Sequence, residues 1–95
     1  MNKMRSIHPG EILREDFLNP LDMSASALAM ELRVPANRIT AIIKEERGVT
    51  TDTAVRLSRH FGNSAQFWLN VQNQYDIKTL EIANGDELNL IRKHS

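Results

Sequence analysis

Two short helical patterns lie very close together in residues 24–44, and this spacing constrains the fold more than any other feature of the chain. Apolar side chains recur at helical spacing in each pattern, first as Leu28, Ala29 and Leu32 and then as Ile39, Ile42 and Ile43. Pro35 suits the start of the second helix, and the small Ala29 lets the two helix axes cross closely. The pattern predicts a helix-turn-helix unit over residues 24–44.

The size and composition of the chain fit one small domain without metal or disulfide support. The chain has 95 residues, of which 41% are hydrophobic, and no cysteine, which excludes disulfides and zinc–thiolate sites. No apolar run approaches the roughly 20 residues of a membrane span, and the N-terminus lacks the apolar centre of a signal peptide. We expect a single domain over residues 1–95, located in the cytoplasm and without membrane contact.

Helix start and stop signals divide the chain into five helices and predict an all-α fold. Proline favours the first turn of a helix, serine and threonine favour its N-cap, and glycine favours its C-terminal end. The first helix is expected from His8-Pro9-Gly10 to just before Asn19-Pro20, and the second starts at a Ser24 cap. The third is expected over residues 35–44, the fourth from Thr50 or Thr51 to Gly62, and the fifth from Ser64 onward.

The signals beyond Tyr75 leave several structures open. Residues 77–83 are compatible with an extension or a restart of the fifth helix, which Asn84-Gly85 would then end. The stretch after them is too short for periodicity to distinguish a strand, a helical turn and a frayed tail. We therefore expect a C-terminal helix with a short extension over residues 64–95, available for dimer or partner contacts.

The net charge of the chain is zero, with 12 basic and 12 acidic residues, but basic residues gather around the helix-turn-helix. Between residues 33 and 59, six basic residues face three acidic ones: Arg33, Arg38, Lys44, Arg47, Arg56 and Arg59 against Glu45, Glu46 and Asp52. A solvated surface explains any one of these charges, whereas the block as a whole favours a side that faces phosphates. We expect a neutral chain of this kind to bind DNA as two copies.

The face of the third helix opposite its isoleucines carries side chains that can read DNA. Asparagine bonds adenine, arginine bonds guanine, and alanine or threonine methyl groups contact thymine; the base-reading candidates are Ala36, Asn37, Arg38 and Thr40. Phosphate contacts fix the register of a protein on DNA, and the candidates for them are Ser24, Ser26, Lys44, Arg47 and Thr50. The alternative for all nine residues is an ordinary solvated surface.

The fifth helix carries an apolar stripe that includes the only tryptophan and the only tyrosine of the chain. Phe67 is expected in the core. Because four helices already close the core of a helix-turn-helix domain, we expect Trp68, Val71 and Tyr75 at an interface between two copies. A twofold dimer through this helix would place two recognition helices about one DNA turn, roughly 34 Å, apart.

The sequence gives no indication of catalysis, a metal or a cofactor. His8, His60 and His94 are scattered and are expected to be exposed or to cap helices. The adjacent carboxylate pairs, Glu15-Asp16 and Glu45-Glu46, point in different directions on a helix. Phosphate-cradling glycine loops and nucleophile motifs are absent from the sequence. We therefore expect no catalytic residues, no metal ligands and no cofactor.

Taken in order, the segments resemble the HigA-type (VapI-like) antitoxins, a branch of the Cro/cI-repressor (XRE) helix-turn-helix superfamily. The resemblance covers about residues 7–75. It rests on His8-Pro9-Gly10-Glu11 with Leu13, Leu28-Ala29, Val34-Pro35-Ala36-Asn37-Arg38-Ile39, Arg47-Gly48-Val49-Thr50, Asp52-Thr53-Ala54, Arg56-Leu57, Phe61-Gly62 and Phe67-Trp68-Leu69.

The resemblance implies a five-helix repressor fold, a homodimer and a role in a type II toxin–antitoxin system. Such an antitoxin binds a cognate RelE-like (HigB-like) mRNA-cleaving toxin and represses the shared operon through a palindromic operator. Two positions depart from the family pattern. Arg33 replaces the usual glycine of the turn, and Ala25 replaces a glutamine that often contacts DNA, which shifts the expected contacts to the third helix.

Two alternatives to this function remain open from the sequence. One is a stand-alone transcriptional repressor of phage or plasmid origin that has no toxin partner. The other is a protein-interaction module with a vestigial helix-turn-helix, which the zero net charge and Ala25 favour.

Overall fold

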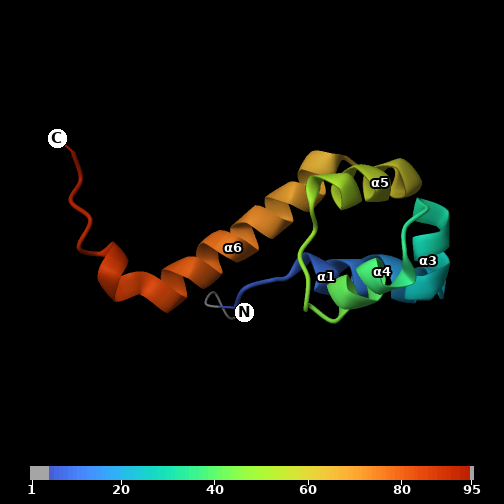
Figure 1. Ribbon diagram of the computed structural model, residues 1–95, viewed down its shortest axis with the longest axis horizontal. Helices are drawn as coiled ribbons and strands as arrows, with labels where there is room; N and C mark the ends of the chain where they lie inside the picture. The colour runs from blue at the N-terminus through green and yellow to red at the C-terminus, as the bar shows by residue number, and fades with distance from the viewer. Residues whose placement is uncertain (1–4, 95) are drawn as a thin grey trace.

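The computed structural model describes residues 5–94, and within them every regular element is helical and no strand is present (Figure 1). The first helix is continuous but changes register, so that it comprises three segments, and four further helices follow. The elements are α1 (Pro9–Ile12), η1 (Leu13–Leu18), α2 (Asn19–Leu21), α3 (Ala25–Leu32), α4 (Ala36–Ile43), α5 (Thr51–Phe61) and α6 (Ala65–Leu88). The predicted five-helix, all-α fold is thereby confirmed.

The first helix does not halt before Asn19-Pro20, as the sequence predicts, but continues to Leu21. Its middle segment, η1, is a π-helical stretch in which the N–H of Asn19 bonds to the carbonyl of Arg14, five residues back. A proline ring normally clashes with the carbonyl four residues before it. The wider π turn relieves that conflict, so the helix passes Pro20 and ends at Asp22 in a left-handed conformation (φ 52°).

The predicted caps of the later helices are confirmed. Ser24 Oγ accepts a hydrogen bond from the N–H of Ala27 at the start of α3 (3.0 Å), and Ser64 Oγ accepts one from Phe67 at the start of α6 (3.0 Å). Gly62 ends α5 with φ 80°, in the left-handed region that glycine enters without a steric penalty. These local signals therefore fix the helix ends independently of the tertiary packing.

The core lies between the helix-turn-helix and the N-terminal half of α6. Its fully buried side chains are Leu13, Leu28, Ile39, Ile42, Ala54, Leu57 and Trp68. Ala29 of α3 is 1% exposed, as expected for the small residue at which the axes of α3 and α4 cross. The ring of Phe17 lies 4.7 Å from that of Phe61 and 5.2 Å from that of Trp68, so aromatic contacts join the first helix to α5 and α6.

The prediction that Phe67 lies in the core is wrong, because its side chain is 38% exposed. Trp68 takes that place, with 0% exposure and an indole N–H that donates to Asn63 Oδ1 (3.0 Å). Adjacent residues of a helix point about 100° apart, so burial of Trp68 turns Phe67 outward. The rings of Phe67 and Trp68 still form a T-shaped pair, with their centroids 5.1 Å apart.

Helix α6 is longer than the sequence signals indicate and extends beyond the other helices (Figure 1). Asn84 departs from helical geometry (φ −124°, ψ 23°), but α6 resumes and ends at Leu88. Asn84-Gly85 therefore bends the helix instead of ending it. The exposed second half of α6 gives the molecule its long axis of 50 Å. Within residues 5–94, no helix is both long and apolar enough to cross a membrane.

Candidate nucleic-acid interface

The turn between α3 and α4 is closed by two backbone hydrogen bonds. The N–H of Arg33 bonds to the carbonyl of Met30 (3.1 Å), and the N–H of Val34 bonds to that of Ala29 (3.0 Å). This is the Schellman arrangement, which requires a left-handed residue after the helix. Arg33 adopts it with φ 63°, so the chain keeps the backbone of a turn glycine at a cost of about 1 kcal/mol.

The N-terminal histidine and glycine fix the position of α4. A Cβ atom on Gly10 would lie 1.8 Å from the carbonyl oxygen of Ile42, so α1 and α4 meet backbone to backbone. His8 Nδ1 accepts a hydrogen bond from the N–H of Gly10 (2.9 Å), and the rings of His8 and Tyr75 form a T-shaped pair with centroids 4.8 Å apart. The capping role expected of a histidine is thus confirmed for His8, and burial lowers its pKa.

Arg14 and Gln72 hold the C-terminal end of α4 and the loop after it, and the sequence pattern pointed to neither. Arg14 Nη1 donates to the carbonyl of Ile43 (2.5 Å). Gln72 Oε1 accepts from the N–H of Val49 (2.7 Å), and a Cβ on Gly48 would lie 2.8 Å from this oxygen. The first helix and α6 therefore hold the end of α4 and the loop after it.

An ion-pair network joins the N-terminal turns of α4 and α5. Asp52 Oδ2 accepts hydrogen bonds from Arg38 Nη1 (2.5 Å) and from Arg56 Nε (3.0 Å). Arg56 Nη1 also donates to the carbonyl of Leu32 at the end of α3 (2.8 Å). Both bonds lower the pKa of Asp52, and the bond from Arg38 has the larger effect. The network therefore joins the end of α3, the first turn of α4 and α5.

The remaining base-reading candidates lie on the outer side of α4. Ala36 and Asn37 are exposed in its first turn, while Thr40 is half-buried. Thr40 Oγ1 donates to the carbonyl of Ala36 (3.1 Å), so its methyl group and its acceptor lone pairs are left for DNA. Among these candidates, only Arg38 is held by an ion pair within residues 5–94.

The phosphate candidates fall into two groups in the structure. Lys44, Arg47 and Thr50 are exposed along the end of α4 and the loop to α5. Thr50 Oγ1 also caps α5, at 3.4 Å from the N–H of Thr53. Ser24 and Ser26 lie at the N-terminus of α3, and no hydrogen bond within residues 5–94 joins their side chains to α4.

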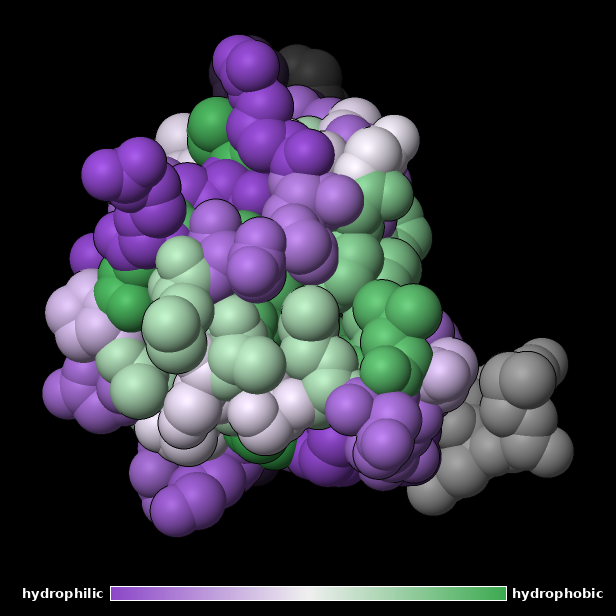
Figure 2. Space-filling view, turned by 90° about the vertical axis from the view of Figure 1, so that its right-hand side faces the viewer, coloured by the Kyte–Doolittle hydropathy of each residue, from purple (hydrophilic) through white to green (hydrophobic). Residues whose placement is uncertain are grey.

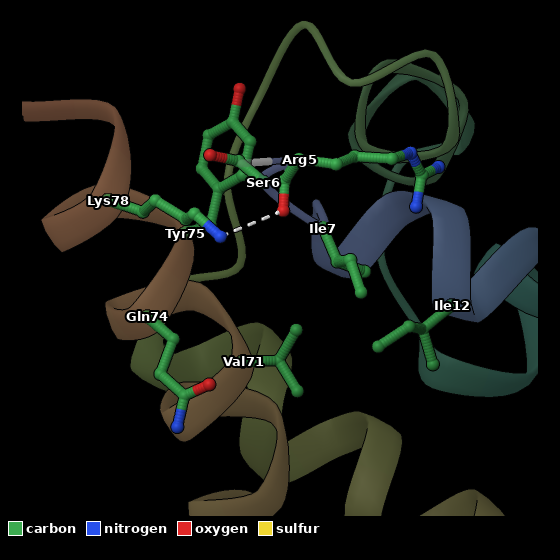
Figure 3. Close-up of a pocket in the computed structure, with 8 residues that line it drawn as sticks. All are labelled: Arg5, Ser6, Ile7, Ile12, Val71, Gln74, Tyr75 and Lys78. Atoms are coloured by element: carbon green, nitrogen blue, oxygen red, sulfur yellow. Dashed lines mark hydrogen bonds between the residues drawn. The ribbon is translucent and has the colours of Figure 1, made fainter. Parts of the chain in front are cut away.

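The predicted dimer residues occupy different environments from those expected. Trp68 is wholly buried within one chain, so it has no surface to offer a second copy and that assignment is wrong. Val71 and Tyr75 line a pocket of about 240 Å³ between α6 and the N-terminal segment, which also contributes Ile7 (Figure 3). Lys78 Nζ donates to the carbonyl of Arg5 (3.3 Å) across this pocket.

A second surface lies at the end of the molecule that carries α3. Figure 2 shows hydrophobic residues across the middle of this face, with hydrophilic residues around them. Two strongly exposed apolar side chains belong to α3 and to the helix before it: Met30 is 79% exposed and Leu21 is 58% exposed. Apolar exposure of this kind is typical of surfaces that meet another protein. Among residues 5–94, no three histidine or acidic side chains converge as metal ligands.

Comparisons with known proteins identify the family of this chain. Virulence-associated protein I of Dichelobacter nodosus is 56% identical over 80 residues, which cover 84% of this chain and 74% of that protein. Antitoxin HigA-1 of Vibrio cholerae is 36% identical over 76 residues, 79% of this chain and 70% of its own. The chain belongs to the HigA family of antitoxins. The family resemblance expected from the sequence is thereby confirmed, although no general family model matches the chain.

A solved structure supports the same assignment at the level of the fold. The Pseudomonas aeruginosa antitoxin HigA, solved with the higBA promoter, superposes with a TM-score of 0.92 and 46% identity. The match covers 96% of this chain and 100% of the other, so the long α6 belongs to the shared HigA fold.

Proposed function

We propose that this HigA-type chain is a DNA-binding antitoxin that represses its own operon as a dimer on a palindromic operator. We further propose that it neutralises a cognate RelE-like (HigB-like) mRNA-cleaving toxin in the cytoplasm. The similarity to an antitoxin solved with promoter DNA supports the first part. The membership of the HigA family supports the second.

The side chains presented by the first turn of α4 are the observation that most supports DNA binding. Asn37 is exposed there, and Arg38 keeps N–H donors that its bond to Asp52 does not use. Recognition helices reach base edges with their N-terminal residues, and these two side chains suit adenine and guanine. Gly10 and Arg14 contact the C-terminal part of α4, and Gln72 holds the loop after it, which favours a fixed reading geometry.

Phosphate contacts are proposed for the C-terminal end of α4, the loop after it and helix N-termini. Lys44 is exposed at the end of α4, and Arg47 is exposed in the loop to α5. Ser24, Ser26 and Thr50 lie at helix starts, where backbone N–H groups attract anions. Such contacts would give register and a salt-dependent affinity without base specificity.

A dimer is proposed because one neutral chain offers few phosphate contacts. With Trp68 buried, we place the interface between copies on the exposed second half of α6, which carries Ile77, Leu80 and Ile82 at 55–56% exposure. Val71 and Tyr75 remain candidates where α6 meets the N-terminal segment. Two copies joined through α6 would match two half-sites roughly 34 Å apart.

A gel-shift experiment with the DNA upstream of the gene tests operator binding. We expect a discrete complex that survives competitor DNA and weakens as salt rises. Absence of any complex with this DNA would contradict the proposal and favour a protein-interaction module. Co-purification with the product of a small basic reading frame beside the gene tests the toxin. Operator binding without any such partner would indicate a stand-alone repressor.

A further inference from the structure

We infer that Asp52 is a positioning residue for operator reading, which holds Arg38 in the orientation from which Arg38 contacts a base. The inference rests on the proposed DNA-binding function and deepens it. It gives a negatively charged residue a favourable role at a surface that faces phosphates.

Asp52 is held in place by contacts that do not involve Arg38. Arg56 donates to Asp52 Oδ2 from Nε and to the carbonyl of Leu32 from Nη1, at 3.0 and 2.8 Å. The carboxylate is therefore tied to the end of α3 as well as to its own helix. The same oxygen then receives Arg38 Nη1 at 2.5 Å.

Arg38 remains able to bond DNA while it is held. A guanidinium group carries five N–H donors, and Asp52 is the one side-chain partner of Arg38 among residues 5–94. The Arg38 side chain is 25% exposed, in the first turn of α4. A long side chain that is ordered before binding loses less rotamer freedom on binding, so the ion pair favours the base-reading state.

Simple electrostatics predicts the opposite effect of Asp52. A carboxylate beside DNA repels phosphates, so its removal should tighten binding to any sequence. If Asp52 positions Arg38, its removal should instead weaken binding to the operator while binding to unrelated DNA stays equal or tightens. The two accounts differ in sign for the operator.

The test compares Asp52→Asn with Glu46→Gln in the full chain. Glu46 is an exposed carboxylate after α4, with no side-chain partner among residues 5–94, so it controls for charge alone. Affinities for operator and scrambled DNA are measured by fluorescence anisotropy, with thermal unfolding to confirm folding. We expect Asp52→Asn to lower the operator-to-scrambled affinity ratio about tenfold and Glu46→Gln to leave this ratio unchanged.

Three results would overturn the inference. The first is an unchanged or higher ratio in Asp52→Asn. The second is an equal loss in Glu46→Gln. The third is an equal loss from Asp52→Asn in an Arg38→Ala background, where no arginine is left to position. A wild-type chain that does not prefer its operator would instead contradict the proposed function.

A second variant covers a failure of Asp52→Asn to fold. Asp52→Glu keeps the negative charge and its place at the N-terminus of α5 but moves the carboxylate by one methylene. We expect Asp52→Glu to lower the operator-to-scrambled affinity ratio below the wild-type value, with binding to scrambled DNA unchanged. A ratio equal to the wild-type value would mean that the position of the carboxylate is irrelevant.

Discussion

Arg33 shows how a single residue can depart from a motif while the backbone keeps its shape. Its φ of 63° closes the turn between α3 and α4 as a glycine would. A β-carbon is unfavourable in this region. Asp22 and Glu45 take similar positions at the ends of α2 and α4. Left-handed helix ends without glycine are therefore a recurrent feature of this chain.

We expect Arg33→Gly to raise the free energy of unfolding by about 1 kcal/mol, because glycine removes the steric cost of the left-handed backbone. Arg33→Ala is the matched control, since it removes the same long side chain but keeps the β-carbon. Denaturant unfolding measures both. Equal stability of the two variants would show that the turn stores no such cost.

At the scale of single residues, the sequence predicts which side chains lie on α4 but not what holds them. Asn37 and Arg38 fall on the predicted outer side of the helix. The bond from Arg38 to Asp52 joins residues 14 positions apart, so it depends on how α5 packs against α4. A local pattern contains no information on that packing. The one part of this network that the sequence itself indicates is the pair of opposite charges Asp52 and Arg56, four residues apart on one helix.

At the scale of elements, the capping residues of the sequence predict where helices begin. They do not predict whether a helix continues through a residue that normally ends it, such as proline. The caps at Ser24, Thr50 and Ser64 are as predicted, because each bonds to a backbone N–H within three residues. The passage of the first helix through Pro20 depends on a π turn that has no sequence signature. Burial of Trp68 likewise depends on how α6 meets the first helix.

The contact between α1 and α4 leads to a sharp prediction about Gly10. We expect Gly10→Ala to destabilise the fold by about 3 kcal/mol or more, because the new Cβ would meet the Ile42 carbonyl at 1.8 Å. Gly85→Ala, with no atom within 4 Å of its Cβ, is the control and should be neutral or slightly stabilising. A small effect at Gly10 in thermal unfolding would contradict this close approach.

The His8 cap should make stability depend on pH. Burial lowers the pKa of folded His8 below its ordinary value of 6.5, so the unfolded chain takes up a proton first as the pH falls. Stability from this group is therefore complete above about pH 6.5 and decreases as the pH falls from there through the folded-state pKa. His8→Asn keeps an acceptor for the N–H of Gly10 but cannot titrate.

Urea unfolding at pH 7.5 and pH 5.0 measures this dependence. We expect the wild type to lose more stability between the two values than His8→Asn. The same loss in both proteins would show that groups other than His8 control the acid sensitivity.

At the scale of the whole molecule, the chain comprises a head, which contains the helix-turn-helix, and an exposed arm. The head consists of the first helix, α3, α4, α5 and the first half of α6, which share one core. The arm is the second half of α6, which extends beyond the other helices (Figure 1). It exposes the apolar side chains Ile77, Leu80 and Ile82. This division suits a protein that reads DNA with one end and assembles with the other.

The affinity of the double variant Asn37→Ala/Arg38→Ala for operator and scrambled DNA tests the central proposal most directly. We expect each substitution to cost about 1–3 kcal/mol of operator binding without loss of folding, and the preference for the operator to disappear. Lys44→Ala is the control, which should weaken binding to both DNAs alike and lower the salt dependence by about one unit. A double variant that binds the operator with unchanged affinity and preference would contradict the assignment of the first turn of α4 as the reading surface.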